Sequence, residues 1–162
     1  MGGMAEARWL DSDEQHTWQA WLSAVRLLDE ALDRQLQRDA GMPHAYYGIL
    51  ATLSAAPDRT MRMSDLASGS NASQSRLSHA VNRLEEAGWV RRERCASDKR
   101  VVYAVLTDAG TQVLRAAAPG HVAAVREHLF DQLTPEQVRQ LGEICQAMLR
   151  KLASCDSSAS AR

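Results

Sequence analysis

The chain has 162 residues, a net charge of −1 and 45% hydrophobic residues, which is enough apolar content for one folded domain with a core. No apolar run approaches the roughly 18 residues of a membrane span, and no basic start leads into an apolar segment, so we expect a cytoplasmic protein. The three cysteines, Cys95, Cys145 and Cys155, are widely spaced and form no CxxC pair, which argues against a disulfide framework and a structural zinc site.

A long first helix is predicted after a disordered N-terminus at residues 1–10. Residues 11–14 place acids at the helix start, and Gly41 ends it. Its apolar stripe is too long for one small core to cover, so we expect part of it to meet a second copy of the chain. The stripe consists of Trp18, Trp21, Leu22, Val25, Leu28, Leu32 and Leu36.

A helix-turn-helix is predicted next. A helix at 44–56, a turn at 57–60 and a short strand at 61–63 lead into a short helix at 64–68, and the polar turn 70–73 caps a longer helix from Gln74 to Ala87. At 100° per residue, the apolar and polar residues of this longer helix fall on opposite faces. The apolar face holds Leu77, Ala80, Val81 and Leu84, and the polar face holds Ser75, Arg76, His79, Asn82 and Arg83.

A β-hairpin follows Gly88. Residues 89–94 and 101–106 have the β-branched and aromatic content of strands, and the polar loop 95–100 joins them as a wing. Residues 59–106 hold nine Arg or Lys against five Asp or Glu, a local charge of +4 within a chain of net charge −1. A polar helix fits the major groove of DNA, and a basic hairpin tip can reach the minor groove. An ordinary solvated helix face is the alternative, but the turn, wing and charge together favour DNA.

Two further helices are predicted after the wing. The first starts at Thr107 and Asp108, runs to Phe130, and is expected to be kinked rather than divided at 119–120. The second starts at Thr134 with Pro at its first position and Gln137 completing a capping box. The predicted fold class is mainly α with a small β-wing: a single winged helix-turn-helix domain at 11–153, with its DNA-binding part at 44–106, dimerisation helices at 11–41 and 108–153, and a flexible tail at 154–162.

Four stretches resemble the MarR family of bacterial transcription regulators, and by pattern the likeness covers residues 12–153. The most specific is an Asp-x-Arg wing followed by Leu-Thr-x-Ala-Gly. The resemblance implies a homodimer that binds a pseudo-palindromic operator in double-stranded DNA, usually as a repressor released by a small ligand or by oxidation. It also implies that Asp98 orients Arg100 toward the minor groove. The stretches are Met63–Ala67, Ser73–Val90, Asp98–Arg100 and Leu106–Gly110.

The candidate site residues fall into two sets. By resemblance, a small aromatic or anionic effector is expected between the dimerisation helices and the winged part, at Trp18, Trp21, His44 and Tyr47. The alternative is that these four are core and interface residues. The predicted DNA contacts are Arg62, Ser73, Gln74, Ser75, Arg76, His79, Asn82, Arg83, Arg94, Asp98, Lys99 and Arg100.

Other function classes are less well supported. The sequence has no nucleophile and base pattern, phosphate loop or zinc-protease motif, so we expect no enzyme, cofactor or metal. His121 and His128, seven residues apart, are typical of a polar surface or interface feature rather than a metal site. Two alternatives to a ligand-responsive repressor remain: a winged-helix protein-interaction module without DNA binding, and a regulator that senses oxidation through cysteine. Arg94 beside Cys95 could favour a thiolate, although a bystander cysteine is the simpler interpretation.

Overall fold

The computed structural model describes residues 7–68 and 74–159, with side chains for 7–68 and 75–152. Ser73 and the side chain of Gln74, both predicted DNA contacts, therefore lie outside the described residues, as does the turn at 70–73. The chain divides into two compact units, Met1–His121 and Val122–Arg162, which are described separately. The element order is α1 (Ser12–Ala40), α2 (His44–Ala55), η1 (Pro57–Arg59), β1 (Thr60–Arg62), α3 (Met63–Ser68), α4 (Gln74–Glu86), β2 (Val90–Arg94), β3 (Val102–Leu106), α5 (Asp108–His128), η2 (Phe130–Gln132) and α6 (Pro135–Ala159).

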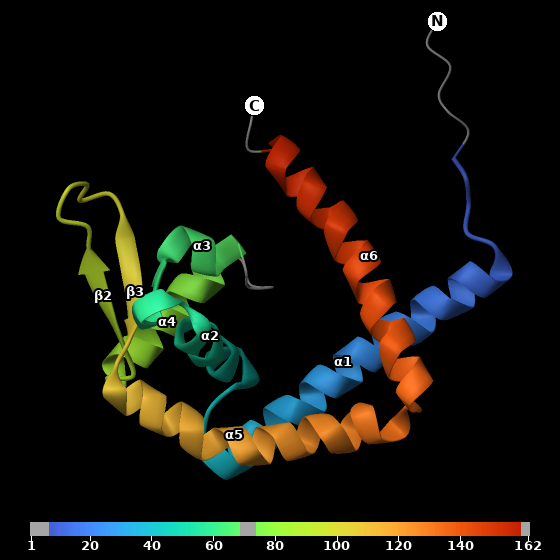
Figure 1. Ribbon diagram of the computed structural model, residues 1–162, viewed down its shortest axis with the longest axis horizontal. Helices are drawn as coiled ribbons and strands as arrows, with labels where there is room; N and C mark the ends of the chain where they lie inside the picture. The colour runs from blue at the N-terminus through green and yellow to red at the C-terminus, as the bar shows by residue number, and fades with distance from the viewer. Residues whose placement is uncertain (1–6, 69–73, 160–162) are drawn as a thin grey trace, which may run out of the picture. The chain divides into compact units, whose positions relative to one another are not determined.

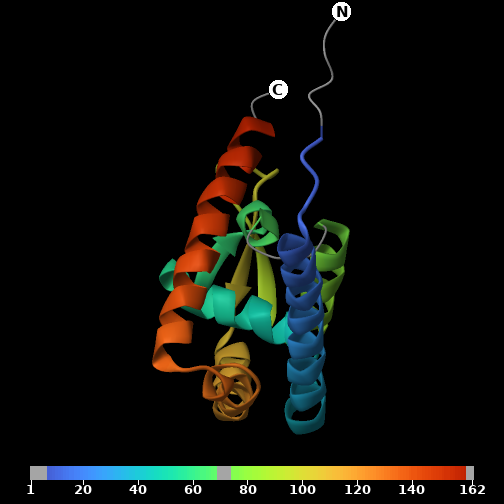
Figure 2. The ribbon, with the colours of Figure 1, turned by 90° about the vertical axis from the view of Figure 1, so that its right-hand side faces the viewer.

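The first unit is a small antiparallel sheet packed against helices. The strand order is β1-β3-β2, with Arg62 opposite Tyr103 and Arg92 opposite Ala104. Helices α2, α3 and α4 contact this sheet, and Figures 1 and 2 show them gathered on one side of it, with the β2–β3 hairpin extending beyond them. The predicted fold class, mainly α with a β-wing, is confirmed.

The core of this unit lies where the helices meet the sheet. Apolar residues from α1, α2, α3, α4, β2, β3 and α5 form one buried cluster, so the wing and the helix-turn-helix share a single core. Burial of this kind stabilises each large aliphatic side chain by about 1.5–3 kcal/mol. Its most completely buried members are Leu36, Met42, Leu50, Leu53, Leu66, Leu77, Leu84, Val81 and Val90.

The caps of α1 are those that its sequence predicts. The side chain of Asp11 accepts hydrogen bonds from the backbone N–H groups of Asp13 and Glu14 at 2.9 and 2.8 Å, and Glu14 accepts one in return from the Asp11 N–H at 3.0 Å. The helix ends at Gly41, whose φ of 63° lies in the left-handed region that glycine adopts without strain. Between these caps, 29 residues give a helix about 44 Å long.

The second unit contains the end of α5 and all of α6. The predicted capping box at the start of α6 is confirmed, because the Thr134 N–H donates to Gln137 Oε1 at 2.9 Å and the Gln137 N–H donates to Thr134 Oγ1 at 3.2 Å. The predicted tail is wrong in its start, since α6 continues through residue 154 to Ala159. Alanine and serine without glycine or proline place no stop signal there. Helix α5 passes through Pro119 as one helix, as predicted.

Exposed apolar side chains occur on helices of both units. On α1, Trp18, Leu22, Val25 and Leu27 are roughly half exposed. None of the described helices is long and apolar enough to cross a membrane. On α6, the corresponding exposed residues are Ile144, Met148, Leu149 and Leu152.

Candidate nucleic-acid interface

Helix α4 has the two faces that its sequence predicts. Leu77, Val81 and Leu84 are fully buried against the core. The opposite face points to solvent and carries hydrogen-bonding groups within two turns. Its exposed members are Ser75, Arg76, His79, Asn82 and Arg83.

Arg83 forms a weak local pair. Its Nη1 donates to Glu86 Oε2 at 2.9 Å, three residues along the same helix, and both side chains are more than half exposed. Exposed pairs of this spacing contribute only a few tenths of a kcal/mol, so an anion can replace the carboxylate at little cost.

The wing tip is organised by Asp98. Its Oδ1 accepts from the Arg100 backbone N–H at 3.0 Å and from Arg100 Nε at 3.2 Å, and its Oδ2 accepts from Arg100 Nη2 at 3.3 Å. These bonds from the Arg100 side chain and backbone hold the pKa of Asp98 below its ordinary value. The pairing of Asp98 with Arg100 that the resemblance implies is therefore confirmed, and it presents an exposed guanidinium next to exposed Lys99.

Two further arginines lie at the edges of the wing. Arg94 is exposed at the end of β2. Arg62 is exposed on β1, where a hydrogen bond with Tyr103 on the neighbouring strand raises the pKa of its guanidinium. Their predicted contacts with DNA stay predictions, as do those of α4 and the wing tip.

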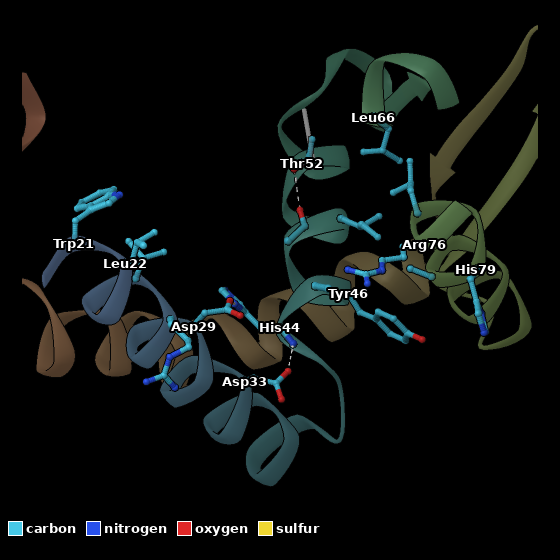
Figure 3. Close-up of a pocket in the computed structure, with 17 residues that line it drawn as sticks. Trp21, Leu22, Asp29, Asp33, His44, Tyr46, Thr52, Leu66, Arg76 and His79 are labelled. Atoms are coloured by element: carbon cyan, nitrogen blue, oxygen red, sulfur yellow. Dashed lines mark hydrogen bonds and ion pairs between the residues drawn. The ribbon is translucent and has the colours of Figure 1, made fainter. Parts of the chain in front are cut away.

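A cavity of about 910 Å³ lies between α1, α2 and α4 (Figure 3). Trp21 and His44, two of the four predicted effector residues, line it. Trp18 lies one turn before Trp21 on α1, outside the lining, and Tyr47 packs against His121 of α5, with ring centroids 4.2 Å apart. The assignment of these four residues to an effector site stays a prediction. The remaining lining includes Leu22, Val25, Arg26, Asp29, Asp33, Tyr46, Thr52, Arg76 and His79.

His44 ties α1 to α2 beside this cavity. Its Nδ1 lies 2.8 Å from Asp29 Oδ1, and its backbone N–H donates to Asp33 Oδ1 at 2.8 Å. Asp33 therefore caps the start of α2 from another helix, because the side chain of the N-cap residue Pro43 has no hydrogen-bond acceptor. Neither aspartate was among the predicted site residues, although their spacing on α1 from Trp21 and Val25 places them on the same helix face.

His121 is the most perturbed histidine of the first unit. It is half-buried between Tyr47 and His44, and among the described residues no hydrogen-bond partner meets its Nδ1. Burial, and then the charge of His44, lower the pKa of His121 below its ordinary value. His121 is therefore packed against neighbouring side chains rather than fully exposed to solvent.

Cys95 sits where β2 leaves the sheet. Its Sγ lies 3.2 Å from Ser97 Oγ, and this hydrogen bond, together with backbone N–H groups of the wing loop, lowers the pKa of the thiol. The thiol is partly exposed. These properties favour thiolate chemistry but do not by themselves make a redox sensor.

The chain resembles known transcriptional regulators in both sequence and structure. A sequence model of the MarR family matches residues 40–101. The crystal structure of Sco3205, a MarR family transcriptional regulator from Streptomyces coelicolor in complex with DNA, is 56% identical, with a TM-score of 0.85 over 91% of this chain and 92% of that one. AbsC, a MarR family regulator from the same organism, is 42% identical, with a TM-score of 0.83 over 91% of this chain and 99% of its own.

A curated relative extends the comparison. The transcriptional repressor MprA of Escherichia coli is 24% identical over 112 residues, which are 69% of this chain and 63% of MprA, so the match spans less than two thirds of that repressor. The likeness to the two Streptomyces regulators covers nearly the whole of each chain. This chain belongs to the MarR family of transcriptional regulators.

Proposed function

We propose that the chain is a homodimeric, sequence-specific DNA-binding repressor that places α4 in the major groove and the β2–β3 wing at the adjacent minor groove. The observation that carries the proposal is the exposed polar face of α4 beside a wing tip where Asp98 holds Arg100 outward. Arginine and asparagine on a helix are the side chains that read base edges, and a basic tip suits the strong negative potential of a narrow minor groove. The DNA complex of Sco3205, at 56% identity, supports the same use of this chain.

The proposed dimer would cover the exposed apolar side chains of α1 and α6. Each helix exposes four large hydrophobic residues, which a monomer in water would leave uncovered. A twofold arrangement would repeat α4 at the spacing of one DNA turn, about 34 Å, and would match a pseudo-palindromic operator. Sedimentation at micromolar concentration tests this directly, and a monomer would contradict the proposed architecture.

A small aromatic acid is the proposed effector. The cavity of about 910 Å³ falls within the size of small-molecule sites, and it combines the apolar faces of Trp21 and Leu22 with the guanidinium of Arg76 and the imidazole of His79 (Figure 3). Because Arg76 and His79 belong to α4, a ligand that engages them would compete with DNA. By linkage, operator DNA would then weaken ligand binding by the same factor.

Two arginine variants test the DNA-binding face. Arg76→Ala should weaken operator binding by about 1–3 kcal/mol and relax sequence preference at one position of each half-site if Arg76 reads a base. Arg83→Ala should weaken all sequences alike and reduce the salt dependence by about one counterion if Arg83 neutralises a phosphate. Fluorescence anisotropy with the DNA upstream of the chain's own gene, at several salt concentrations, separates the two.

Arg139→Ala is the matched control. Like Arg83, Arg139 is an exposed arginine paired with a glutamate three residues away on its own helix, but it lies on α6. This variant should leave operator affinity unchanged. If Arg76→Ala and Arg83→Ala both bind like the unmodified protein, α4 is not the recognition helix. If the unmodified protein binds no DNA even at low salt, the protein-interaction module replaces the repressor.

Tryptophan fluorescence tests the effector. Titration with salicylate and related aromatic acids should quench emission of the free protein, and the apparent affinity should fall when operator DNA is bound. Trp21→Phe should remove most of the response and Trp18→Phe should retain it, since Trp21 lines the cavity and Trp18 does not. Ligand binding that leaves operator affinity untouched would refute release by this ligand class and leave the DNA-binding proposal standing.

A further inference from the structure

Arg92 differs from the other arginines of the wing in its surroundings. It lies on β2, an edge strand of the sheet, opposite Ala104 of β3. Its side chain is only 26% exposed, whereas that of its neighbour Arg91 is 57% exposed and that of Arg100 at the wing tip is 91% exposed. Arg92 is therefore turned toward the protein rather than toward solvent or a phosphate.

Among the residues that the structure describes, the side-chain hydrogen-bond partners of Arg92 all belong to α4. Nη1 donates to Asn82 Oδ1 at 2.6 Å and to Glu85 Oε2 at 2.9 Å, and Nη2 donates to the carbonyl oxygen of Ser78 at 3.1 Å. The Arg92 backbone N–H donates to Glu85 Oε1 at 2.9 Å. One residue of the wing is thus joined to α4 by four hydrogen bonds, and both carboxylate oxygens of Glu85 are used.

The partners of Arg92 lie on one side of α4, between its buried face and its exposed face. Ser78, Asn82 and Glu85 are spaced by four and three residues and form one stripe along two helical turns. At 100° per residue the stripe lies about 100° from the centre of the buried face, near Leu77, and it shares Asn82 with the edge of the exposed polar face. A planar guanidinium that donates hydrogen bonds to this flank resists rotation of α4 about its own axis. The apolar contacts of the core are less directional than these hydrogen bonds.

We propose that Arg92 is a positioning residue for DNA recognition, which fixes the rotation of α4 relative to the wing so that major-groove and minor-groove contacts are made in one register. This role rests on the proposed function. Arg92 itself would contact no phosphate, because its donors are directed to Asn82, Glu85 and Ser78.

The same contact restricts what Asn82 can do. Arginine can only donate, so the atom that faces Arg92 is the amide oxygen of Asn82, and the amide nitrogen is left for DNA. Asparagine reads adenine through its oxygen and nitrogen together. Held in this way, Asn82 keeps one lone pair of its oxygen for DNA, while its amide nitrogen can donate to a phosphate oxygen or to the acceptor edge of guanine.

The test compares specific with non-specific binding across salt concentrations. Arg92→Ala should lower affinity for the operator duplex about tenfold while affinity for an unrelated duplex of equal length and the salt slope stay unchanged. A residue that merely supported the fold would lower both affinities together. Arg92→Lys, which keeps the charge but loses the planar fork, should fall between the two, and it carries the comparison if Arg92→Ala does not fold.

Arg91→Ala is the matched control, since it removes the neighbouring arginine of the same strand, whose Nε donates to Glu93 Oε1 on that strand at 2.6 Å. It should leave the ratio of specific to non-specific affinity unchanged. Equal loss on both duplexes with a shallower salt slope for Arg92→Ala or Arg92→Lys would make Arg92 a phosphate contact and overturn the proposal. An unchanged ratio would overturn it as well. If the unmodified protein shows no operator preference, the proposed function itself fails, and the positioning role with it.

Discussion

Gly110 lies in the first turn of α5, where the chain passes under the wing, and we predict that Gly110→Ala destabilises the protein. A Cβ added to Gly110 would meet the carbonyl of Trp89, with its carbon 3.0 Å away and its oxygen closer still, and would lie 2.7 Å from Leu106 Cδ1. Non-bonded carbon atoms prefer separations of about 3.5–4.0 Å, so these neighbours must move apart.

The carbonyl of Trp89 cannot move freely. Its oxygen accepts from the Thr107 N–H at 3.1 Å, and the Trp89 N–H donates to the carbonyl of Leu84 at 2.9 Å at the end of α4. The Thr107 hydroxyl donates to the carbonyl of Gly88 at 2.7 Å. A shift of the backbone at Trp89 therefore disturbs the hydrogen bonds that join the end of α4, the start of β2 and the start of α5.

The magnitude follows from three contributions. Overpacking costs about 1–3 kcal/mol, and loss of one hydrogen bond costs about 1 kcal/mol. Replacing glycine by alanine within a helix returns about 1 kcal/mol. The net loss is about 2 kcal/mol in the free energy of unfolding, which corresponds to a Tm lower by about 4–8 °C for a chain of this size.

Thermal and urea unfolding followed by circular dichroism, at one fixed protomer concentration, measure this change. Gly48→Ala is the control, because Gly48 is also helical but nothing lies within 4 Å of an added Cβ, so this variant should be as stable as the unmodified protein or up to about 1 kcal/mol more stable. A Gly110→Ala protein as stable as the unmodified one would refute the steric reasoning. Equal destabilisation by both variants would show that the close contacts of Gly110 are not the cause.

Three further predictions concern titratable and charged groups. Asp98→Ala and Arg100→Ala should each weaken operator binding, and the double variant should lose less than the sum, whereas strict additivity in anisotropy titrations would argue against coupling. Burial lowers the pKa of His121, so the unfolded state binds more protons than the folded state as the pH falls below about 6.5, and the free energy of unfolding should decrease there. The urea midpoint of His121→Phe should lack this part of the pH dependence. Identical pH profiles for the variant and the unmodified protein would contradict the role of His121. The hydrogen bond from Ser97 lowers the pKa of Cys95, so Ser97→Ala should slow alkylation of Cys95 by iodoacetamide at pH 7, as followed by mass spectrometry; equal rates would show that the bond is unimportant in solution.

Local chemistry made the helix ends predictable from the sequence. Asp11 and Gly41 bound α1, and Thr134 with Gln137 starts α6, because each cap depends on residues within one turn of the helix end. The two faces of α4 were predictable for the same reason, since burial follows the helical period.

Contacts between distant segments were not predictable in this way. The hydrogen bonds of Arg92 join strand β2 to helix α4. In the sequence, neither the charge of Arg92 nor its position distinguishes it from the exposed Arg91 beside it. The packing of Tyr47 against His121 depends on how α5 returns to α2, so the periodicity of α2 alone could not predict it. Periodicity locates a face, but only tertiary packing decides what that face meets.

The charged edge strand of the wing also bears on self-association. An open sheet edge invites another strand to pair with it, and exposed edges of this kind lead to aggregation. On β2 the outward N–H of Arg92 is already occupied by Glu85, and Arg91, Glu93 and Arg94 line the same edge with charge. Residues of the proposed DNA-binding surface thus also protect the edge of β2 from pairing with a strand of another molecule. A substitution of Glu85 would expose this edge to such pairing and would remove its hydrogen bonds between α4 and Arg92.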